Sequence, residues 1–129
     1  MNILDEQISE NQRQLLTSWR VRVRQMGHDV GQKGMKDYHI IPFLLQRRRS
    51  TFFTLDADFY KRNLCHSRYC LVSMDVRKQE AAGYVRRVLR HPEFDTVAKR
   101  AGKALRVSPL GIAVWRLHAE REMHFDWVD

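Results

Sequence analysis

The chain has 129 residues, of which 43% are hydrophobic, and its 23 Lys and Arg outnumber 15 Asp and Glu to give a formal net charge of +8. The length fits a single domain over residues 1–129, the apolar fraction excludes a disordered chain, and no apolar run approaches the roughly 20 residues of a membrane span. A basic surface favours polyanions, so RNA or DNA is an expected partner.

The first half of the sequence predicts strands alternating with helices. Short apolar runs predict buried strands, and apolar residues spaced by three and four predict helices. The expected elements are a strand at Asn2–Leu4, a helix from about Glu10 to Arg20 that continues through Val21–Met26 to a terminating Gly27, a strand at His28–Val30, a helix from Tyr38 to Arg48 capped by Asp37, and a strand at Thr51–Leu55.

The second half continues this alternation and ends in a hairpin. The expected elements are a short helix at 58–64, a strand at Tyr69–Met74, helices at Lys78–Leu89 and Phe94–Ala101, and strands at Ala104–Val107 and Ile112–Leu117 around a turn at 108–111. This order predicts an α/β fold with three layers, α/β/α, around a mostly parallel sheet. The final hairpin would place antiparallel strands at one edge of that sheet.

Acidic residues follow three of the predicted strands. In open α/β sheets, ligands bind beyond the carboxyl ends of the strands, so these side chains should gather at one edge. Clustered carboxylates repel one another unless a cation is present, and Mg²⁺ or Mn²⁺ accepts carboxylate ligands with water. The acidic candidates are Asp5 and Glu6 after the first strand, Asp56 and Asp58 after the third, Asp75 after the fourth, and Asp37 at the start of a helix.

Three segments of the first 60 residues resemble the PIN-like nuclease domains. Ile3-Leu-Asp-Glu-Gln-Ile8 resembles the family's opening strand motif, and Gly27-His-Asp-Val30 followed by Asp37-Tyr-His-Ile-Ile41 resembles the segment in which an Asp opens a helix. Thr51-Phe-Phe-Thr-Leu-Asp-Ala-Asp-Phe59 resembles the hallmark apolar strand with its acidic end. The likeness is greatest to the short bacterial form found as the presumed toxin of toxin–antitoxin pairs.

The resemblance implies a metal-dependent endoribonuclease that hydrolyses RNA phosphodiester bonds. The positions that match the family's ligands are Asp5, Asp37 and Asp56, which would hold Mg²⁺ or Mn²⁺, with Asp58 as a further catalytic carboxylate. Thr54 matches a supporting position, and Glu6 is a second supporting candidate. The resemblance also implies an antitoxin protein and a homodimer as partners. The basic residues expected to hold RNA phosphates are Arg47, Arg48, Arg49, Lys61 and Arg62.

Two other functions remain open at this point. One is a catalytically inactive PIN-like module that binds nucleic acid or a protein partner. The other is a receiver-like phosphoacceptor switch, in which Asp56 would be phosphorylated beside Asp5 and Glu6, with Ser73 on the fourth strand and Lys103 near the fifth. The polar N-terminus shows no signal peptide, and with the absence of a membrane span this gives a cytoplasmic protein as the expectation.

Overall fold

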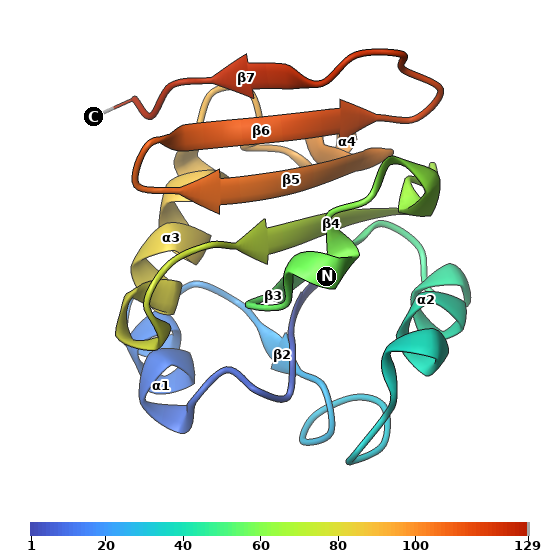
Figure 1. The fold of residues 1–129 in the computed structure, drawn as a ribbon. Helices are drawn as coiled ribbons and strands as arrows, with labels where there is room; N and C mark the ends of the chain where they lie inside the picture. The colour runs from blue at the N-terminus through green and yellow to red at the C-terminus, as the bar shows by residue number, and fades with distance from the viewer. Residues whose placement is uncertain (129) are drawn as a thin grey trace.

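The structure is a computed structural model that describes residues 1–128, and its centre is one seven-stranded sheet (Figure 1). The strands are β1 (Asn2–Leu4), β2 (Arg24–Gln25), β3 (Ser50–Thr54), β4 (Tyr69–Met74), β5 (Lys103–Ser108), β6 (Gly111–Arg116) and β7 (Met123–Phe125). The helices are α1 (Glu10–Ser18), α2 (Asp37–Leu45), α3 (Ala81–Arg90) and α4 (Val97–Arg100), and the 3₁₀ turns are η1 (Ala57–Phe59), η2 (Arg62–Leu64) and η3 (Lys78–Glu80).

The strand order is β2-β1-β3-β4-β5-β6-β7. Neighbouring strands are parallel from β2 to β5, whereas β5, β6 and β7 pair antiparallel. The predicted α/β class, the mostly parallel sheet and the C-terminal antiparallel hairpin are therefore confirmed. The hairpin of β5 and β6 is followed by a third antiparallel strand, β7, which forms the outer edge.

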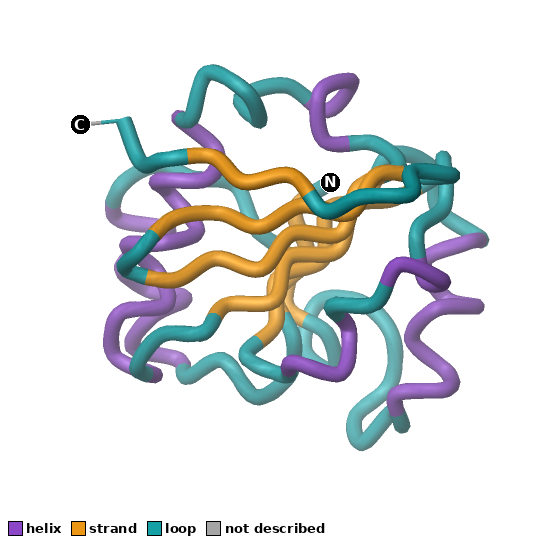
Figure 2. Tube along the Cα trace, turned by 45° about the horizontal axis from the view of Figure 1, so that its top comes forward, coloured by secondary structure: helices purple, strands orange, loops and turns teal. Residues whose placement is uncertain are grey.

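Helices cover both faces of the sheet, as the predicted three layers require (Figures 1 and 2). Alternate residues of each strand point to opposite faces. In β3, Phe53 packs into a core with Leu16 of α1 and Val85 of α3, whereas Phe52 packs into a second core with Leu44 of α2. Both phenylalanines are fully buried, because β3 is covered on both of its faces.

The segment after α1 differs from the prediction. The helix ends at Ser18 because Arg20 adopts a left-handed conformation with φ of 62°. The backbone N–H of Val21 then bonds to the carbonyl of Leu16, and that of Arg20 bonds to the carbonyl of Thr17. This is the Schellman pattern, which usually has Gly where this chain has Arg20. The expected helical continuation through Met26 is therefore wrong, and Gly27, with φ of 81°, lies in a turn after a strand instead.

The second strand also lies elsewhere than predicted. It is formed by Arg24 and Gln25, while Val30 makes only an isolated bridge with Met26. The pairing is stabilised by polar contacts: Gln25 Nε2 donates to the carbonyl of Ile8, and Asp29 accepts from the N–H of Gln25. A two-residue strand held in this way carries no apolar pattern for sequence reasoning to detect.

The part of the chain that the structure describes contains no helix whose length and apolar character would allow it to cross a membrane.

Candidate metal centre

The strand order places a switch point between β1 and β3. β1 is followed by β2 on one side, and β3, β4 and β5 extend on the other. The chain leaving β1 forms α1 on one face, whereas the chain leaving β3 forms η1, whose Phe59 packs on the opposite face. Ligands of open α/β sheets bind at such a point, outside the carboxyl ends of the strands. Asp5 follows β1 and Asp56 follows Thr54 at the end of β3, so both lie at this point.

Three carboxylates meet beside the switch point. Asp37, Asp56 and Asp58 each present an oxygen, and these oxygens all lie within 4.8 Å of one another. Asp37 is the first residue of α2, whereas Asp56 and Asp58 flank the start of η1. The carboxylates therefore come from two segments of the chain that only the tertiary fold brings together.

The loop after β3 fixes Asp56 and Asp58 relative to one another. Asp56 is the N-cap of η1, and its Oδ1 accepts the backbone N–H of Asp58 at 2.9 Å. The backbone N–H of Asp56 in turn donates to Thr54 Oγ1 at 3.0 Å. Ser73 of β4 adds a bond from its hydroxyl to the carbonyl of Asp56. Asp56 is consequently held by both neighbouring strands.

Asp5 borders this group and is held differently. Its Oδ2 accepts the hydroxyl of Thr54 at 2.6 Å, and its backbone N–H donates to the carbonyl of Phe53. Burial raises the pKa of Asp5, and the charge of Asp56 raises it further against the opposing hydrogen bonds from Thr54 and the backbone. Burial, together with the charge of Asp56, therefore disfavours the ionised form of Asp5.

The pKa of Asp37 is raised as well. Partial desolvation raises the pKa of this carboxyl, and the neighbouring carboxylates of Asp56, Asp5 and Asp58 raise it further. The four predicted catalytic carboxylates thus lie at one edge of the sheet, where Asp37 interacts with each of the other three. The predicted metal ligands were Asp5, Asp37 and Asp56; the structure brings Asp37 and Asp56 into the tightest group with Asp58, and Asp5 lies at its border.

These residues fit a hard divalent cation. Carboxylate oxygens are the ligands that Mg²⁺ and Mn²⁺ accept, and Mg²⁺ commonly uses one or two of them with several waters. Asp37 and Asp58 are exposed and Asp56 is half-buried, so water and a phosphate can approach the group. A cation there would also offset the repulsion that raises the pKa of Asp5 and Asp37.

Two further acidic residues lie outside the group. The carboxylate oxygens of Glu6 accept the backbone N–H of Gly34 at 2.9 and 3.2 Å, so this side chain supports the loop that leads to Asp37. Asp75 follows β4 and is exposed, and its backbone N–H donates to the carbonyl of Val107. Neither belongs to the three-carboxylate group among the described residues.

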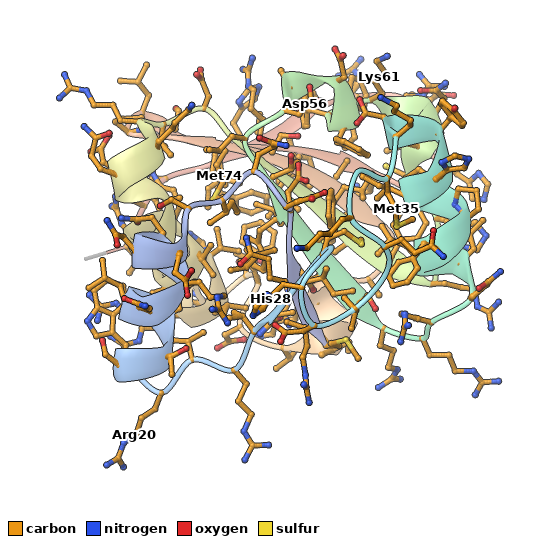
Figure 3. The ribbon with its side chains drawn as sticks, turned by 90° about the horizontal axis from the view of Figure 1, so that it is seen from below. Arg20, His28, Met35, Asp56, Lys61 and Met74 are labelled. Carbon is orange, nitrogen blue, oxygen red and sulfur yellow. The ribbon has the colours of Figure 1, made fainter. Side chains whose placement is uncertain are left out.

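The predicted phosphate-binding residues divide between the two edges of the sheet. Lys61 lies five residues after Asp56 on the chain leaving the carboxyl end of β3, and Figure 3 shows the two residues near one another. The next residue, Arg62, stacks over the ring of Trp115. Arg47, Arg48 and Arg49 instead connect the end of α2 to the start of β3, and the N–H of Arg49 bonds to the carbonyl of Arg68 just before β4. The structure does not bring these three arginines to the carboxylates.

Sequence reasoning missed a polar set that extends from the carboxylates toward β7. Ser73 pairs in register with Arg106 of β5, and the guanidinium of Arg106 lies 5.5 Å from the ring centre of Tyr60. Tyr60 donates a hydrogen bond of 2.5 Å to Glu122, which also contacts His124. The available signal was Arg106 itself, a charged residue between the apolar Leu105 and Val107 of a predicted strand.

A comparison of the chain with protein-family models, with curated proteins and with solved structures finds no match.

Proposed function

We propose that this protein is a metal-dependent endoribonuclease that hydrolyses RNA phosphodiester bonds. The observation that carries the proposal is the meeting of Asp37, Asp56 and Asp58 within 4.8 Å, beside Asp5 at the switch point of a parallel sheet. The net charge of +8 supports a polyanionic substrate, because an acidic centre on a basic protein combines attraction of RNA with a place for a cation.

In this proposal each residue has a defined task. Asp56 and Asp58 hold Mg²⁺ or Mn²⁺, and the exposed Asp37 completes the ligand set from α2. Asp5 adds charge at the border of the site, and Thr54 fixes its carboxylate. When bound, such an ion lowers the pKa of a coordinated water and neutralises charge that develops on the phosphate. Lys61 and Arg106, both exposed, are the cations that we assign to the phosphates on either side of the scissile bond.

The assay for this function is cleavage of a labelled single-stranded RNA with Mg²⁺ or Mn²⁺, and with EDTA. We expect EDTA to abolish cleavage, and Asp56→Asn and Asp37→Asn to lower the rate by about 100-fold or more, the scale of effect seen when metal sites are disrupted. Asp75→Asn is the matched control, because it removes an exposed carboxylate at the end of β4, outside the group. Cleavage that persists in EDTA, or an equal loss in Asp75→Asn, would contradict the proposal.

The same assay separates the two rival functions. RNA binding without cleavage, insensitive to EDTA and to Asp5→Ala, would identify an inactive nucleic-acid-binding module. The receiver-like switch predicts labelling by acetyl phosphate that Asp56→Asn abolishes. The position of Lys103 disfavours this switch: it is the first residue of β5, at the sheet edge opposite Asp56, and its ammonium donates to the carbonyl of Lys99.

The biological setting remains part of the proposal. A role as the toxin of a toxin–antitoxin pair, an antitoxin partner, a homodimer and a cytoplasmic location follow from the resemblance to the short PIN-like domains. Co-purification of a small protein encoded beside this chain, and release of RNA cleavage when that protein is removed, would support this setting.

A further inference from the structure

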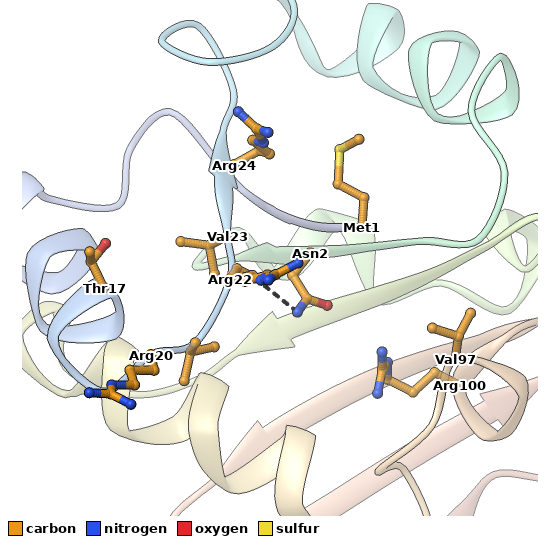
Figure 4. A pocket seen from close by; sticks show the side chains of 10 residues that line it. Met1, Asn2, Thr17, Arg20, Arg22, Val23, Arg24, Val97 and Arg100 are labelled. Carbon is orange, nitrogen blue, oxygen red and sulfur yellow. Dashed lines mark hydrogen bonds between the residues drawn. The ribbon is translucent and has the colours of Figure 1, made fainter.

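A basic pocket opens at the amino edge of the sheet, opposite the carboxylates. Its lining includes Asn2, the first residue of β1, and Arg24, the first residue of β2, and its volume is about 730 Å³. Cavities of this size are typical of sites for small organic ligands. The side chains that line it are those of Met1, Asn2, Thr17, Arg20, Val21, Arg22, Val23, Arg24, Val97 and Arg100 (Figure 4).

Four arginines face this pocket, and no Asp or Glu among the described residues lines it. Arg20 and Arg22 come from the segment between α1 and β2, Arg24 begins β2, and Arg100 ends α4. In Figure 4, Arg100 lies across the pocket from Arg20, with Asn2 between them. Arginines from distant parts of the sequence thus line one pocket.

Arg100 is the strongest indication of an anionic ligand. This residue is only 5% exposed, and its guanidinium donates hydrogen bonds to two neutral groups, the hydroxyl of Thr51 and the carbonyl of Phe94. The nearest acidic residue in the sequence, Asp95, has its carboxylate bonded to Lys99. Burial disfavours the charged guanidinium of Arg100, and the nearby carboxylate of Asp95 offsets this in part, so an anion in the pocket would add further compensation.

The conformation of Arg20 adds a second indication. This residue holds φ of 62°, a left-handed conformation that costs little for Gly or Asn and more for other residues. Here the position that most helices give to Gly instead supplies a guanidinium to the pocket.

We propose that this pocket binds the phosphate of a nucleotide, either free or at the end of an RNA chain. The planar fork of arginine matches phosphate oxygens with two parallel hydrogen bonds, which explains the use of arginine at all four charged positions. The volume leaves room for a nucleoside beside the phosphate, and Val21, Val23 and Val97 offer it apolar walls. The site is independent of the proposed metal centre, which lies at the other edge.

The test is isothermal titration calorimetry of the full chain in EDTA with 5′-AMP, adenosine and inorganic phosphate. We expect AMP to bind, phosphate to bind more weakly, and adenosine not to bind. The double variant Arg22→Gln with Arg24→Gln should weaken AMP binding by about tenfold or more, the effect of losing charge-assisted hydrogen bonds. A double variant of two exposed arginines outside the pocket, Arg90→Gln with Arg121→Gln, removes the same charge and should retain affinity.

Three outcomes would overturn the proposal. If the control variant lost as much affinity for AMP as the pocket variant, general attraction between opposite charges would explain the loss. Equal affinities for adenosine and AMP would show that the pocket does not recognise the phosphate. Displacement of AMP by a polyglutamate peptide that binds more tightly would assign the pocket to an acidic protein segment. Asp56→Asn should leave AMP binding unchanged, which keeps this result separate from that of the RNA cleavage assay.

A terminal phosphate is distinguished from a free nucleotide by two oligonucleotides of identical sequence, with and without a 5′-phosphate. Tighter binding of the phosphorylated chain, lost in Arg22→Gln with Arg24→Gln, would assign the pocket to RNA ends. Equal binding of both chains together with retained AMP binding would assign it to free nucleotides.

Discussion

The hydroxyl of Thr54 donates a hydrogen bond of 2.6 Å to the carboxylate of Asp5 and accepts one of 3.0 Å from the backbone N–H of Asp56. Thr54 is fully buried, so water does not compete for either bond. One side chain therefore connects the carboxyl ends of β1 and β3, the two strands between which the proposed metal centre lies.

Replacing Thr54 by Val tests this connection, since the two side chains have nearly the same shape. The change leaves a buried N–H and a half-buried carboxylate without their partner, which costs about 1–3 kcal/mol of unfolding free energy. We expect urea denaturation to show this loss, and Mn²⁺ affinity to fall because Asp5 and Asp56 are less firmly placed. Thr54→Ser retains the hydroxyl and should retain the affinity; an equal loss of affinity in both variants would show that the hydroxyl is not responsible.

The carboxylates make the stability of the metal-free protein depend on pH. The pKa of Asp37 is raised in the folded state, so folding favours its protonated form. The metal-free protein therefore becomes less stable as pH rises from the ordinary Asp pKa of about 3.9 through the raised value. Asp37→Asn removes this titration. In EDTA, we expect the unfolding temperature of Asp37→Asn to rise relative to that of the natural sequence as pH increases across this range.

Added Mg²⁺ should reverse the order of the two unfolding temperatures, so that the natural sequence becomes more stable than Asp37→Asn. A cation binds the ionised carboxylates, so its stabilising effect should grow with pH over the same range and be smaller in Asp37→Asn. Thermal unfolding between pH 4 and 8, with Mg²⁺ or EDTA, measures both effects. A difference between the two proteins that stays constant with pH would show that Asp37 ionises without interference from its neighbours.

Glu6 should influence the metal centre through the loop at 31–36. Its carboxylate accepts the N–H of Gly34, three residues before Asp37. Glu6→Gln weakens this contact, and we expect Mn²⁺ affinity to fall by a few-fold, the lower range of effects of residues that position ligands. Glu10→Gln is the control, because it removes the same charge from an exposed pair with Arg13. A loss as large as that of Asp56→Asn would instead make Glu6 a ligand.

The central strands could be predicted because burial and sequence pattern coincide there. Tyr69–Met74 was predicted at its observed bounds, and all six of its residues are buried. A strand covered on both faces is mostly apolar, so a short and largely apolar run in the sequence predicts it. The acidic ends of β1 and β3 were predictable for the same reason, since they mark where burial stops.

The elements that were predicted at the wrong residues or missed depend on contacts between residues distant in sequence. β2 is anchored by Gln25, whose amide binds carbonyls of the loop after β1, and no local pattern reveals this. β7 was missed although Met123 and Phe125 alternate with the exposed His124, because three residues give too short a pattern. The grouping of Asp58 with Asp37, and the distance of Arg47–Arg49 from the site, depend on where α2 lies across the sheet.

The contact between Tyr60 and Glu122 attaches the loop after β3 to the segment before β7. The hydroxyl of Tyr60 donates to Glu122 Oε2 at 2.5 Å. Burial raises the pKa of Tyr60, and the bond to the Glu122 carboxylate raises it further, so the phenol keeps its proton and remains a donor. This bond therefore fixes the position of the residues that follow Asp58.

Tyr60→Phe removes this donor and, among the described residues, leaves the carboxylate of Glu122 with its contact to His124. We expect a loss of about 1–2 kcal/mol of unfolding free energy, less than for a fully buried charged bond because both side chains are partly solvated. Tyr38→Phe is the control, since Tyr38 is 73% exposed and should tolerate the change. If Tyr60 also orders the loop that carries Lys61, then Tyr60→Phe should raise the KM for RNA while kcat changes little. An unchanged KM would confine its role to stability.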